Sequence, residues 1–166
     1  MADATPSAAA GDAPETIYLT CAAFQDHDPM PRRFTCDGED LAPALAWRGI
    51  PGDTLELALS CEDPDAPGGT FVHWMMVGID SASTGLDENT IPDGAVVGVN
   101  DFATSGYRGP CPPSGDDSHR YVFTVFASGA GLSLDNDFSA QQLHDALRGN
   151  VIAVGKLTGL YQRDSA

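Results

Sequence analysis

Short apolar runs separated by turn-forming residues fill the chain from about Thr16 onward. Four of these runs have the length and composition of β-strands: residues 53–63, 70–79, 120–127 and 151–161. Gly, Pro, Asp and Asn cluster between the runs, which is typical of many short strands rather than of helical repeats. The pattern therefore predicts an all-β or mostly β domain.

The run at 53–63 alternates apolar and polar positions most regularly. Leucines and a cysteine occupy every second position, and Asp63 is the next residue on that apolar face. In the run at 120–127, Tyr121 shares one face with other large apolar residues. Both runs therefore predict strands with an apolar face directed into a core.

The run at 70–79 is apolar on both faces. Strict alternation places His73 on the same face as Phe71, Met75, Val77 and Ile79. Apolar residues on both faces predict a strand that is covered on both sides, as in a sandwich or a sheet packed against helices.

One helix and two irregular stretches are also predicted. Ser139 and Gln142 have the spacing of a capping box, an apolar stripe follows, and Gly149 is placed to end the helix. Residues 1–15 offer little apolar surface beyond alanine, which predicts a disordered acidic tail. Residues 80–95 are rich in Ser, Gly, Asp and Pro, which predicts a loop.

Length and charge narrow the classes of function. A chain of 166 residues predicts a single domain, here residues 16–166. The net charge is −16, from 24 acidic and 8 basic residues, so the surface repels nucleic acids and anionic membranes. Aspartate far outnumbers glutamate and Lys156 is the only lysine, which predicts halophilic adaptation: at 1 M salt a Debye length of about 3 Å screens self-repulsion.

The four cysteines show neither a CxxC pair nor the spacing of a zinc site: Cys21, Cys36, Cys61 and Cys111. We expect buried thiols, and we expect Cys36 and Cys111 to be unbridged, although both lie in turn-rich stretches where a bridge is the alternative. Residues 1–16 lack the basic and apolar segments of a signal peptide, and no run is long enough to span a membrane. The sequence predicts a cytoplasmic protein without stable membrane insertion.

Two carboxylates follow directly on the run at 53–63, in the sequence Asp63-Pro64-Asp65-Ala66-Pro67. The prolines fix the backbone as it leaves the strand. We therefore expect Asp63 to lean over the end of the sheet and Asp65 to hydrogen-bond within the turn. The alternative for both residues is an Asx turn without a functional role.

Two histidines lie within or at the start of predicted strands. His73 has no polar neighbour in its strand, and His119 follows the glycine- and proline-rich loop at 106–115. Glycine permits close approach of the backbone to a ligand, and free N–H groups in such a loop can form an anion-binding nest. Two histidines and a carboxylate that converge there predict a compact anion site.

These motifs, in this order and spacing, resemble the signature of the phosphatidylethanolamine-binding protein family, also called Raf kinase inhibitor-like proteins. They are Asp63 to Pro67, Phe71-Val72-His73-Trp74, residues 106–115 and His119-Arg120-Tyr121. Residues 31–38 and 100–102 resemble the bacterial and archaeal branch of that family. The resemblance implies a large antiparallel sheet packed on a smaller sheet, a short C-terminal helix and a pocket at one end of the sheet.

Carried over residue by residue, the resemblance places eight residues at the family's ligand pocket: Asp63, Asp65, Phe71, His73, Gly109, Pro110, His119 and Tyr121. Asp65 has a supporting position among them, and Phe71 lies at an aromatic rim. Val72 and the pair Asp116-Asp117 depart from the family pattern, and two acids beside an anion pocket weaken the case for phosphate. We expect Arg120, on the opposite strand face, to form a structural ion pair.

The resemblance implies binding of a small anionic ligand, such as phosphate or a phosphorylated head group, and regulation of a kinase or protease partner. One alternative is a hydrolase or metal-dependent enzyme that uses the His and Asp residues, and another is a pure protein-interaction module. Because motifs such as HExxH and Gly-x-Ser-x-Gly are missing from the sequence, binding is favoured over catalysis, without cofactor or metal. The family branch further implies a homodimer.

Overall fold

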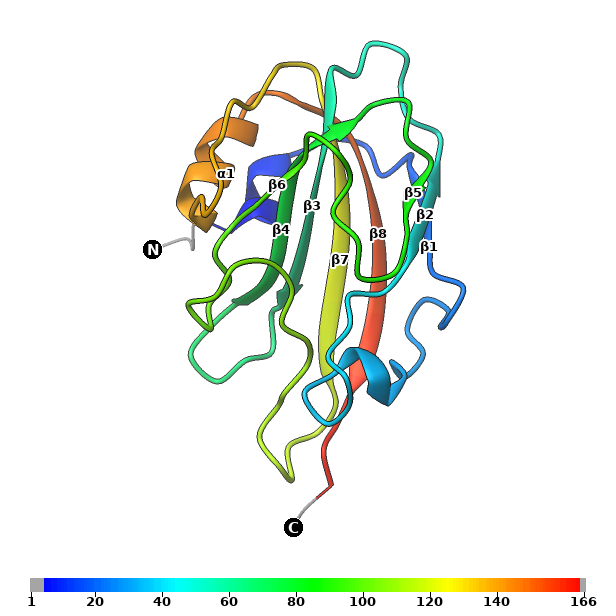
Figure 1. Cartoon of the computed structure of the whole chain (residues 1–166), viewed down its shortest axis with the longest axis vertical. Coiled ribbons are helices and arrows are strands. Elements are labelled where there is room, and N and C mark those ends of the chain that lie inside the picture. The colour runs from blue at the N-terminus through cyan, green and yellow to red at the C-terminus, as the bar shows by residue number, and fades with distance from the viewer. Residues whose placement is uncertain (1–4, 165–166) are drawn as a thin grey trace.

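The computed structural model describes residues 5–164 and contains two antiparallel sheets (Figure 1). The larger sheet has the strand order β6-β4-β3-β7-β8 and the smaller one has the order β1-β2-β5. The large sheet consists of β3 (Glu56–Asp63), β4 (Phe71–Asp80), β6 (Val96–Val97), β7 (His119–Ser128) and β8 (Val151–Tyr161). The small sheet consists of β1 (Tyr18–Thr20), β2 (Leu45–Arg48) and β5 (Gly85–Leu86).

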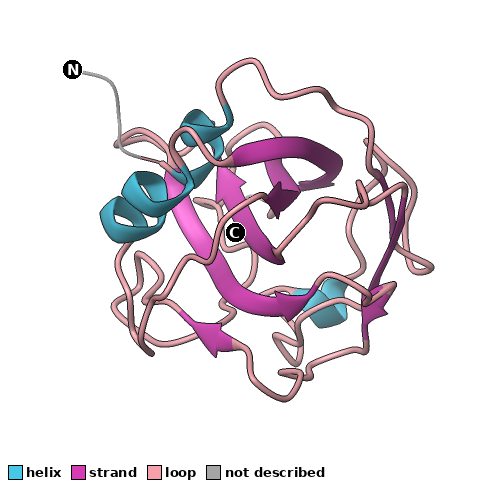
Figure 2. Ribbon diagram, turned by 90° about the horizontal axis from the view of Figure 1, so that it is seen from above, coloured by secondary structure: helices cyan, strands magenta, loops and turns pink. Residues whose placement is uncertain are grey.

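The small sheet packs on one face of the large sheet, and the helix α1 (Ala140–Leu147) and the short 3-10 helix η1 (Pro6–Ala10) cover the opposite face. These two helices lie side by side, as Figure 2 shows, and a second 3-10 helix, η2, spans Arg32–Phe34. One core cluster lies between the two sheets, and a second lies between the large sheet and α1 with η1. The predicted mostly β fold, with a large sheet on a smaller sheet and one short helix near the C-terminus, is confirmed.

Strand β3 follows the predicted alternation. Leu57 and Leu59 are fully buried in the core between the sheets, and Asp63 at the end of the strand is 3% exposed. The strand begins at Glu56 rather than at residue 53, and Leu55 is 62% exposed. The apolar face therefore leads directly to a buried carboxylate at the end of the sheet.

Strand β4 departs from strict alternation. Its pairing with β3 shifts register twice, and at the second shift His73 is the extra residue on β4. Met75 and Val77 pack in the core beneath α1, whereas Ile79 packs between the sheets. The prediction that these residues share one face was wrong, because each β-bulge reverses the alternation that follows it.

The predicted helix is confirmed. Ser139 caps α1 by accepting a hydrogen bond from the backbone N–H of Gln142 (3.0 Å), and the Gln142 side chain accepts one from the backbone N–H of Ser139 (2.8 Å). Leu143 and Leu147 are fully buried against the sheet. Gly149 follows the last turn with a φ of +81°, a conformation that favours glycine.

Two stretches that were predicted to be irregular contain regular structure. Residues 6–10 form η1, where Ala9 is buried against the helix-side core, so a disordered tail is wrong for residues 5–15. Residues 1–4 lie outside the described residues. The predicted loop at 80–95 contains β5, which pairs with β2 and completes the small sheet. The sequence did not indicate η1 because the segment contains only small side chains. Its order comes from the packing of Ala9 and its neighbours against the rest of the protein.

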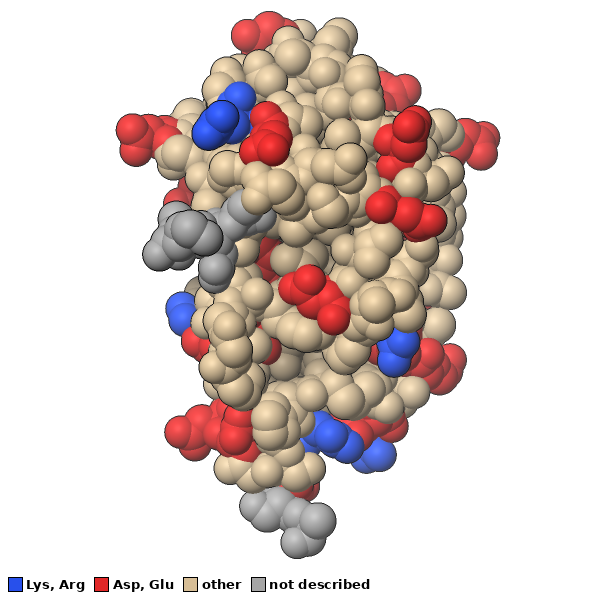
Figure 3. Space-filling model, turned by 90° about the vertical axis from the view of Figure 1, so that its left-hand side faces the viewer, with Lys and Arg blue, Asp and Glu red and all other residues tan. Residues whose placement is uncertain are grey.

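The surface carries many acidic and few basic groups. Figure 3 shows one face of the molecule, on which acidic side chains are spread widely with fewer basic ones among them. Within residues 5–164 no helix is long and apolar enough to cross a membrane.

Candidate functional site

A small pocket lies at the end of the large sheet where β3 ends and β4 and β7 begin. Its volume is about 160 Å³, which suits a small molecule. The pairing of Asp63 with Phe71 and the start of β7 at His119 bring the predicted residues to this end. The lining residues are Asp63, Ala66, Pro67, Phe71, His73, Phe102, Cys111, Pro112, Pro113, His119 and Tyr121.

His119 is held between two carboxylates. Its Nδ1 donates to Oδ2 of Asp63 (2.7 Å), and its Nε2 donates to Oδ2 of Asp116 (3.1 Å). Because carboxylates accept hydrogen bonds, a ring that carries protons on both nitrogens satisfies both contacts, so this geometry favours the imidazolium form. Burial opposes this charge, but the hydrogen bonds to Asp63 and Asp116 outweigh it and raise the pKa of His119.

Asp63 therefore has two structural partners. Its Oδ1 accepts the backbone N–H of Asp65 (2.8 Å), which closes the turn after β3, while Oδ2 accepts from His119. The Asx turn and the pocket role were alternatives in the sequence, and the geometry shows that one carboxylate makes both contacts. The turn fixes the carboxylate that orients the histidine.

His73 is placed by its β-bulge, a feature that commonly re-aims a side chain beside a functional site. Its Nδ1 donates to the backbone carbonyl oxygen of Arg108 (2.7 Å). Burial lowers the pKa of His73, although that hydrogen bond and the nearby Asp63 oppose the change. At neutral pH the ring is uncharged, and Nε2 is left as a hydrogen-bond acceptor.

Tyr121 forms part of the pocket and is fully buried. Its hydroxyl lies near the Asp63 carboxylate and interacts with it weakly, but no group in the described part of the chain meets hydrogen-bond geometry with it. Burial and the neighbouring charge of Asp63 raise the pKa of Tyr121 far above its usual range, so the phenol stays protonated. A buried hydroxyl without a partner is uncommon and costs about 1–3 kcal/mol, which makes it a candidate ligand contact.

Aromatic rings form the rim. Phe71 and Phe102 meet edge to face with their centroids 4.7 Å apart, and both rings contact His73, at 5.0 Å and 5.5 Å. The Arg108 guanidinium lies 5.0 Å from the centroid of Phe102. The rim is therefore apolar and aromatic. Arg108 is not part of the pocket lining, and its Nε pairs with Oδ2 of Asp40 (3.3 Å).

Asp65 is not part of the pocket lining. Its carboxylate accepts two side-chain hydrogen bonds from Arg120, of 2.9 Å and 2.8 Å, and one from the Arg120 backbone N–H (2.9 Å). These hydrogen bonds lower the pKa of Asp65 to about 2. The predicted structural ion pair of Arg120 is confirmed, and Asp65 is the partner that supports the turn behind Asp63.

Gly109 and Pro110 are also absent from the lining, contrary to the sequence prediction. The Gly109 N–H donates to Oδ1 of Asp40 (2.8 Å), so it does not belong to a free anion nest. A Cβ on Gly109 would lie 2.0 Å from the carbonyl oxygen of Phe34. Glycine is thus required for close packing against another loop, and the Pro110 carbonyl likewise accepts the N–H of Cys36 (3.1 Å).

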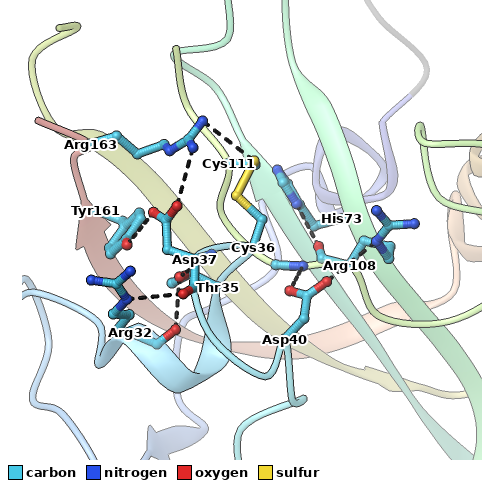
Figure 4. The surroundings of a disulfide bond; sticks show 11 residues. Arg32, Thr35, Cys36, Asp37, Asp40, His73, Arg108, Cys111, Tyr161 and Arg163 are labelled. Carbon is cyan, nitrogen blue, oxygen red and sulfur yellow. Dashed lines mark hydrogen bonds and ion pairs between the residues drawn. A yellow bond between two sulfur atoms is a disulfide. The ribbon is translucent and has the colours of Figure 1, made fainter. Parts of the chain in front are cut away.

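A disulfide joins Cys36 to Cys111, and the expectation that these cysteines are unbridged was wrong. The two sulfurs meet because the backbone of residues 107–110 is already bound to the segment at 34–40. Figure 4 shows the network around the bond, in which Tyr161 donates to Asp37 (2.6 Å) and Arg163 pairs with the same carboxylate (3.2 Å). Cys21 and Cys61 are free and buried, as expected.

Sequence reasoning missed most of the pocket wall. Phe102 and the residues Pro112 and Pro113 lie in loops, where strand periodicity carries no information about side-chain direction. Phe102 stood in a motif that carried the resemblance, which was the available signal. Pro112 and Pro113 likewise stood in the motif at residues 106–115, although the composition of that loop did not indicate which of its residues form the wall.

The arrangement of possible metal ligands does not form a metal site in the described residues. Across residues 5–164 no group of three His, Cys, Asp or Glu side chains is arranged to hold a metal ion. At the pocket, the two nitrogens of His119 and Nδ1 of His73 are already used as hydrogen-bond donors. The arrangement can orient protons and accept a small polar ligand.

Residues 20–162 match the phosphatidylethanolamine-binding protein family, and the chain belongs to that family. Among curated relatives, a UPF0098 protein of Methanothermobacter thermautotrophicus is 47% identical over 152 residues, which cover 89% of this chain and 99% of the relative. A UPF0098 protein of Aquifex aeolicus is 40% identical, with 86% of each chain covered.

Solved structures show the same fold. A phosphatidylethanolamine-binding protein homologue of Chlamydia trachomatis, CT736, matches with a TM-score of 0.84 and 33% identity, covering 90% of this chain and 99% of that one. The family member YbcL of E. coli matches with a TM-score of 0.84 and 31% identity, covering 89% and 98%. Carboxypeptidase Y inhibitor, at 14% identity and a TM-score of 0.55, shares the fold.

Proposed function

We propose that the pocket binds a small phosphorylated ligand that also carries an amine, as the head group of phosphatidylethanolamine does. The observation that carries this proposal is the unpaired, buried hydroxyl of Tyr121 in a pocket that also contains two histidines and Asp63. The family to which the chain belongs is described by binding of phosphatidylethanolamine, which supports the same ligand class.

The charges of the site argue against a bare phosphate dianion. Asp63 and Asp116 contribute two negative charges, and the imidazolium of His119 contributes one positive charge. No lysine or arginine belongs to the lining formed by the described residues. A ligand that brings its own cation compensates the remaining negative charge, whereas a dianion adds to it.

The hydrogen-bonding groups fit such a ligand. The phosphate can accept a hydrogen bond from the hydroxyl of Tyr121, and the ammonium group can donate one to Nε2 of His73. An ammonium group is attracted both to Asp63 and to the faces of Phe71 and Phe102. The small volume, about 160 Å³, favours a head group over a whole lipid inside the pocket.

Ligand titration followed by NMR of the histidine rings tests the proposal. We expect phosphoethanolamine to move the signals of His73 and His119 at lower concentration than inorganic phosphate or ethanolamine alone. If none of the three compounds moves either signal, the proposal is wrong. If phosphate alone binds as well as phosphoethanolamine, the amine has no role.

Replacing Tyr121 by phenylalanine separates binding from stability. Tyr121→Phe removes only the hydroxyl, and we expect phosphoethanolamine affinity to fall about tenfold, which corresponds to about 1.4 kcal/mol. The unfolding free energy should stay constant or rise by up to about 1 kcal/mol, because an unsatisfied buried group is lost. Tyr18→Phe is the matched control, since Tyr18 is 57% exposed on β1. Equal affinity of Tyr121→Phe and wild type would remove Tyr121 from the binding site.

A further inference from the structure

We propose that the Cys36–Cys111 disulfide is a redox modification site, opened by a dithiol, and that its state sets the affinity of the pocket for its ligand. The second claim, that the redox state sets ligand affinity, rests on the proposed function of the pocket. Disulfides are stable in oxidising compartments, and in reducing ones they are usually transient or redox-sensing.

The bond is part of the pocket wall. Cys111 lines the pocket together with Pro112 and Pro113, which directly follow it in the chain. We call residues 111–115 the proline loop. The Asp116 N–H donates to the carbonyl of Pro113 (3.2 Å), and the Asp116 side chain accepts from His119. A continuous series of contacts therefore links the disulfide to the charged histidine of the pocket.

Backbone hydrogen bonds leave the proline loop dependent on the disulfide. Before the loop, the N–H of Gly109 and the carbonyl of Pro110 are bound to the 34–40 segment. At its end, the N–H of Gly115 donates to the carbonyl of Arg163 (3.2 Å). In the described structure, the disulfide is the one direct bond between residues 111–114 and the 34–40 segment, and Arg163 adds an indirect link through Cys111 and Asp37. Reduction would release this wall while the stretch at 107–110 stays bound.

The surroundings favour thiol–disulfide exchange. Cys111 is exposed, and Nη1 of Arg163 lies 3.9 Å from its sulfur. Figure 4 marks this contact between Arg163 and the disulfide. A neighbouring guanidinium stabilises a thiolate, so it lowers the barrier for Cys111 to leave as one. Arg163 is held in place by its ion pair with Asp37 (3.2 Å).

The exchange proceeds in two steps. A thiolate of the dithiol attacks Sγ of Cys36, which forms a mixed disulfide and releases Cys111 as a thiolate beside Arg163. The second thiolate of the reagent then attacks the reagent's own sulfur in that mixed disulfide and releases Cys36 as a thiolate. The reagent leaves as a cyclic disulfide, and the protein gains two electrons and, after protonation of both thiolates, two protons.

A loosened proline loop must be ordered again when the ligand binds. Fixing the backbone of a loop costs conformational entropy, so we expect phosphoethanolamine affinity to fall about tenfold or more on reduction. Reoxidation should restore it. Cys21 and Cys61 stay buried, so alkylation of the native protein should detect two additional thiols after reduction.

The test uses the full chain, equilibrated in dithiothreitol or in glutathione buffers that span reducing and oxidising conditions. Thiol alkylation with mass detection gives the redox state, tryptophan fluorescence reports the fold, and NMR titration with phosphoethanolamine gives the affinity. The double variant Cys36→Ala/Cys111→Ala should match the reduced protein and ignore reductant, whereas Cys21→Ala should keep the response.

The outcomes separate the two proposals. Equal affinity of the reduced and oxidised forms overturns the switch and leaves the binding proposal intact. If neither form binds phosphoethanolamine, the proposed function fails, and the ring signals of His73 and His119 decide whether reduction still remodels the pocket: unchanged signals overturn the switch. A disulfide that resists reducing glutathione buffers, or reduction that unfolds the whole domain, also overturns it.

The rate of disulfide reduction tests the role of Arg163, because a purely structural role of this arginine would leave that rate unchanged. Arg163→Gln should slow reduction by dithiothreitol severalfold, and Arg163→Lys should restore part of the rate. Arg33→Gln is the matched control, because Arg33 pairs with Glu88 elsewhere on the surface (2.8 Å). Unchanged reduction rates in Arg163→Gln would remove the arginine from the proposal.

Discussion

The two faces of the large sheet carry one buried carboxylate each at the same end, and the two carboxylates have different partners. Glu62 and Asp63 are adjacent in β3, so they point to opposite faces, and they are 4% and 3% exposed. Glu62 accepts hydrogen bonds from the backbone and hydroxyl of Ser7 (2.9 Å and 2.7 Å) and from the hydroxyl of Ser60 (3.1 Å).

The partners of Asp63 are of another kind. One is the backbone of Asp65, and the other is the ring of His119, which can change its charge. Neutral hydroxyl and amide donors fix Glu62 and anchor the segment around η1 to the sheet. A titratable partner makes the environment of Asp63 sensitive to protons and to ligands. The chemistry of the partner, rather than burial, distinguishes the carboxylate that anchors η1 from the carboxylate in the pocket.

The largest effect is expected on the pocket face. Asp63→Ala leaves the buried His119 without its closest counter-charge, and we expect the unfolding free energy to fall by about 3 kcal/mol. Phosphoethanolamine binding should be lost with it. Urea unfolding and NMR titration measure the two effects.

Asp65→Ala is the matched control for that substitution. It removes a neighbouring carboxylate whose partner, Arg120, is 54% exposed on its side chain, so the loss should stay below about 1 kcal/mol. Ligand affinity should be nearly unchanged. Equal losses of stability in the two variants would contradict the distinction between the pair in the pocket and the pair behind it.

A smaller loss of stability, without a loss of ligand affinity, is expected for a substitution on the helix face. Glu62→Ala leaves the donors of Ser7 and Ser60 without their acceptor, so we expect a loss of about 2 kcal/mol of unfolding free energy. Hydrogen exchange should quicken in the segment around η1, while phosphoethanolamine affinity stays at the wild-type value.

The partner variant Ser7→Ala sharpens this result. Because Ser7 and Glu62 contact each other, the double variant should lose less stability than the sum of the single losses, by about 0.5 kcal/mol or more. Additive losses would mean that the contact does not hold the segment. A change in ligand affinity on Glu62→Ala would mean that the two faces are coupled.

The sequence allowed the long strands to be predicted, because their apolar alternation directly reflects burial. It also allowed the capping box of α1 to be predicted, since that motif is local. Strand β4 was assigned with the wrong faces, because a β-bulge inserts one residue and inverts all that follow. The segment around η1 was missed because its order depends on long-range contacts such as Ser7 with Glu62.

The site was predictable to a similar extent. The structure brings five of the eight predicted residues to the pocket lining: Asp63, Phe71, His73, His119 and Tyr121. Asp65, Gly109 and Pro110 instead hold the turn and the loops behind it. A motif identifies residues that surround a site, but which of them face the ligand depends on loop packing. The disulfide was also missed, because loop packing brings together two cysteines that are 75 residues apart in the sequence.

The smallest predicted effect concerns pH. The pKa of His119 is raised in the folded state because its hydrogen bonds to Asp63 and Asp116 outweigh the cost of burial. The folded protein therefore binds this proton more tightly than the unfolded chain. Its contribution to stability is complete below the ordinary histidine pKa of about 6.5 and is lost as pH rises through the folded value.

His73 has the opposite sign. Burial lowers its pKa, so its contribution is complete above about pH 6.5 and is lost as pH falls through the folded value. Above about pH 6.5 the unfolding free energy should therefore decline as pH rises through the folded pKa of His119, by less than the losses expected for Asp63→Ala and Glu62→Ala. Urea unfolding at a series of pH values measures the slope. Asp63→Asn should flatten this decline, whereas His144→Gln, on α1 across the sheet from the pocket, should leave it intact. A slope that persists in Asp63→Asn would show that the charge of His119 does not depend on the carboxylate that distinguishes the pocket face.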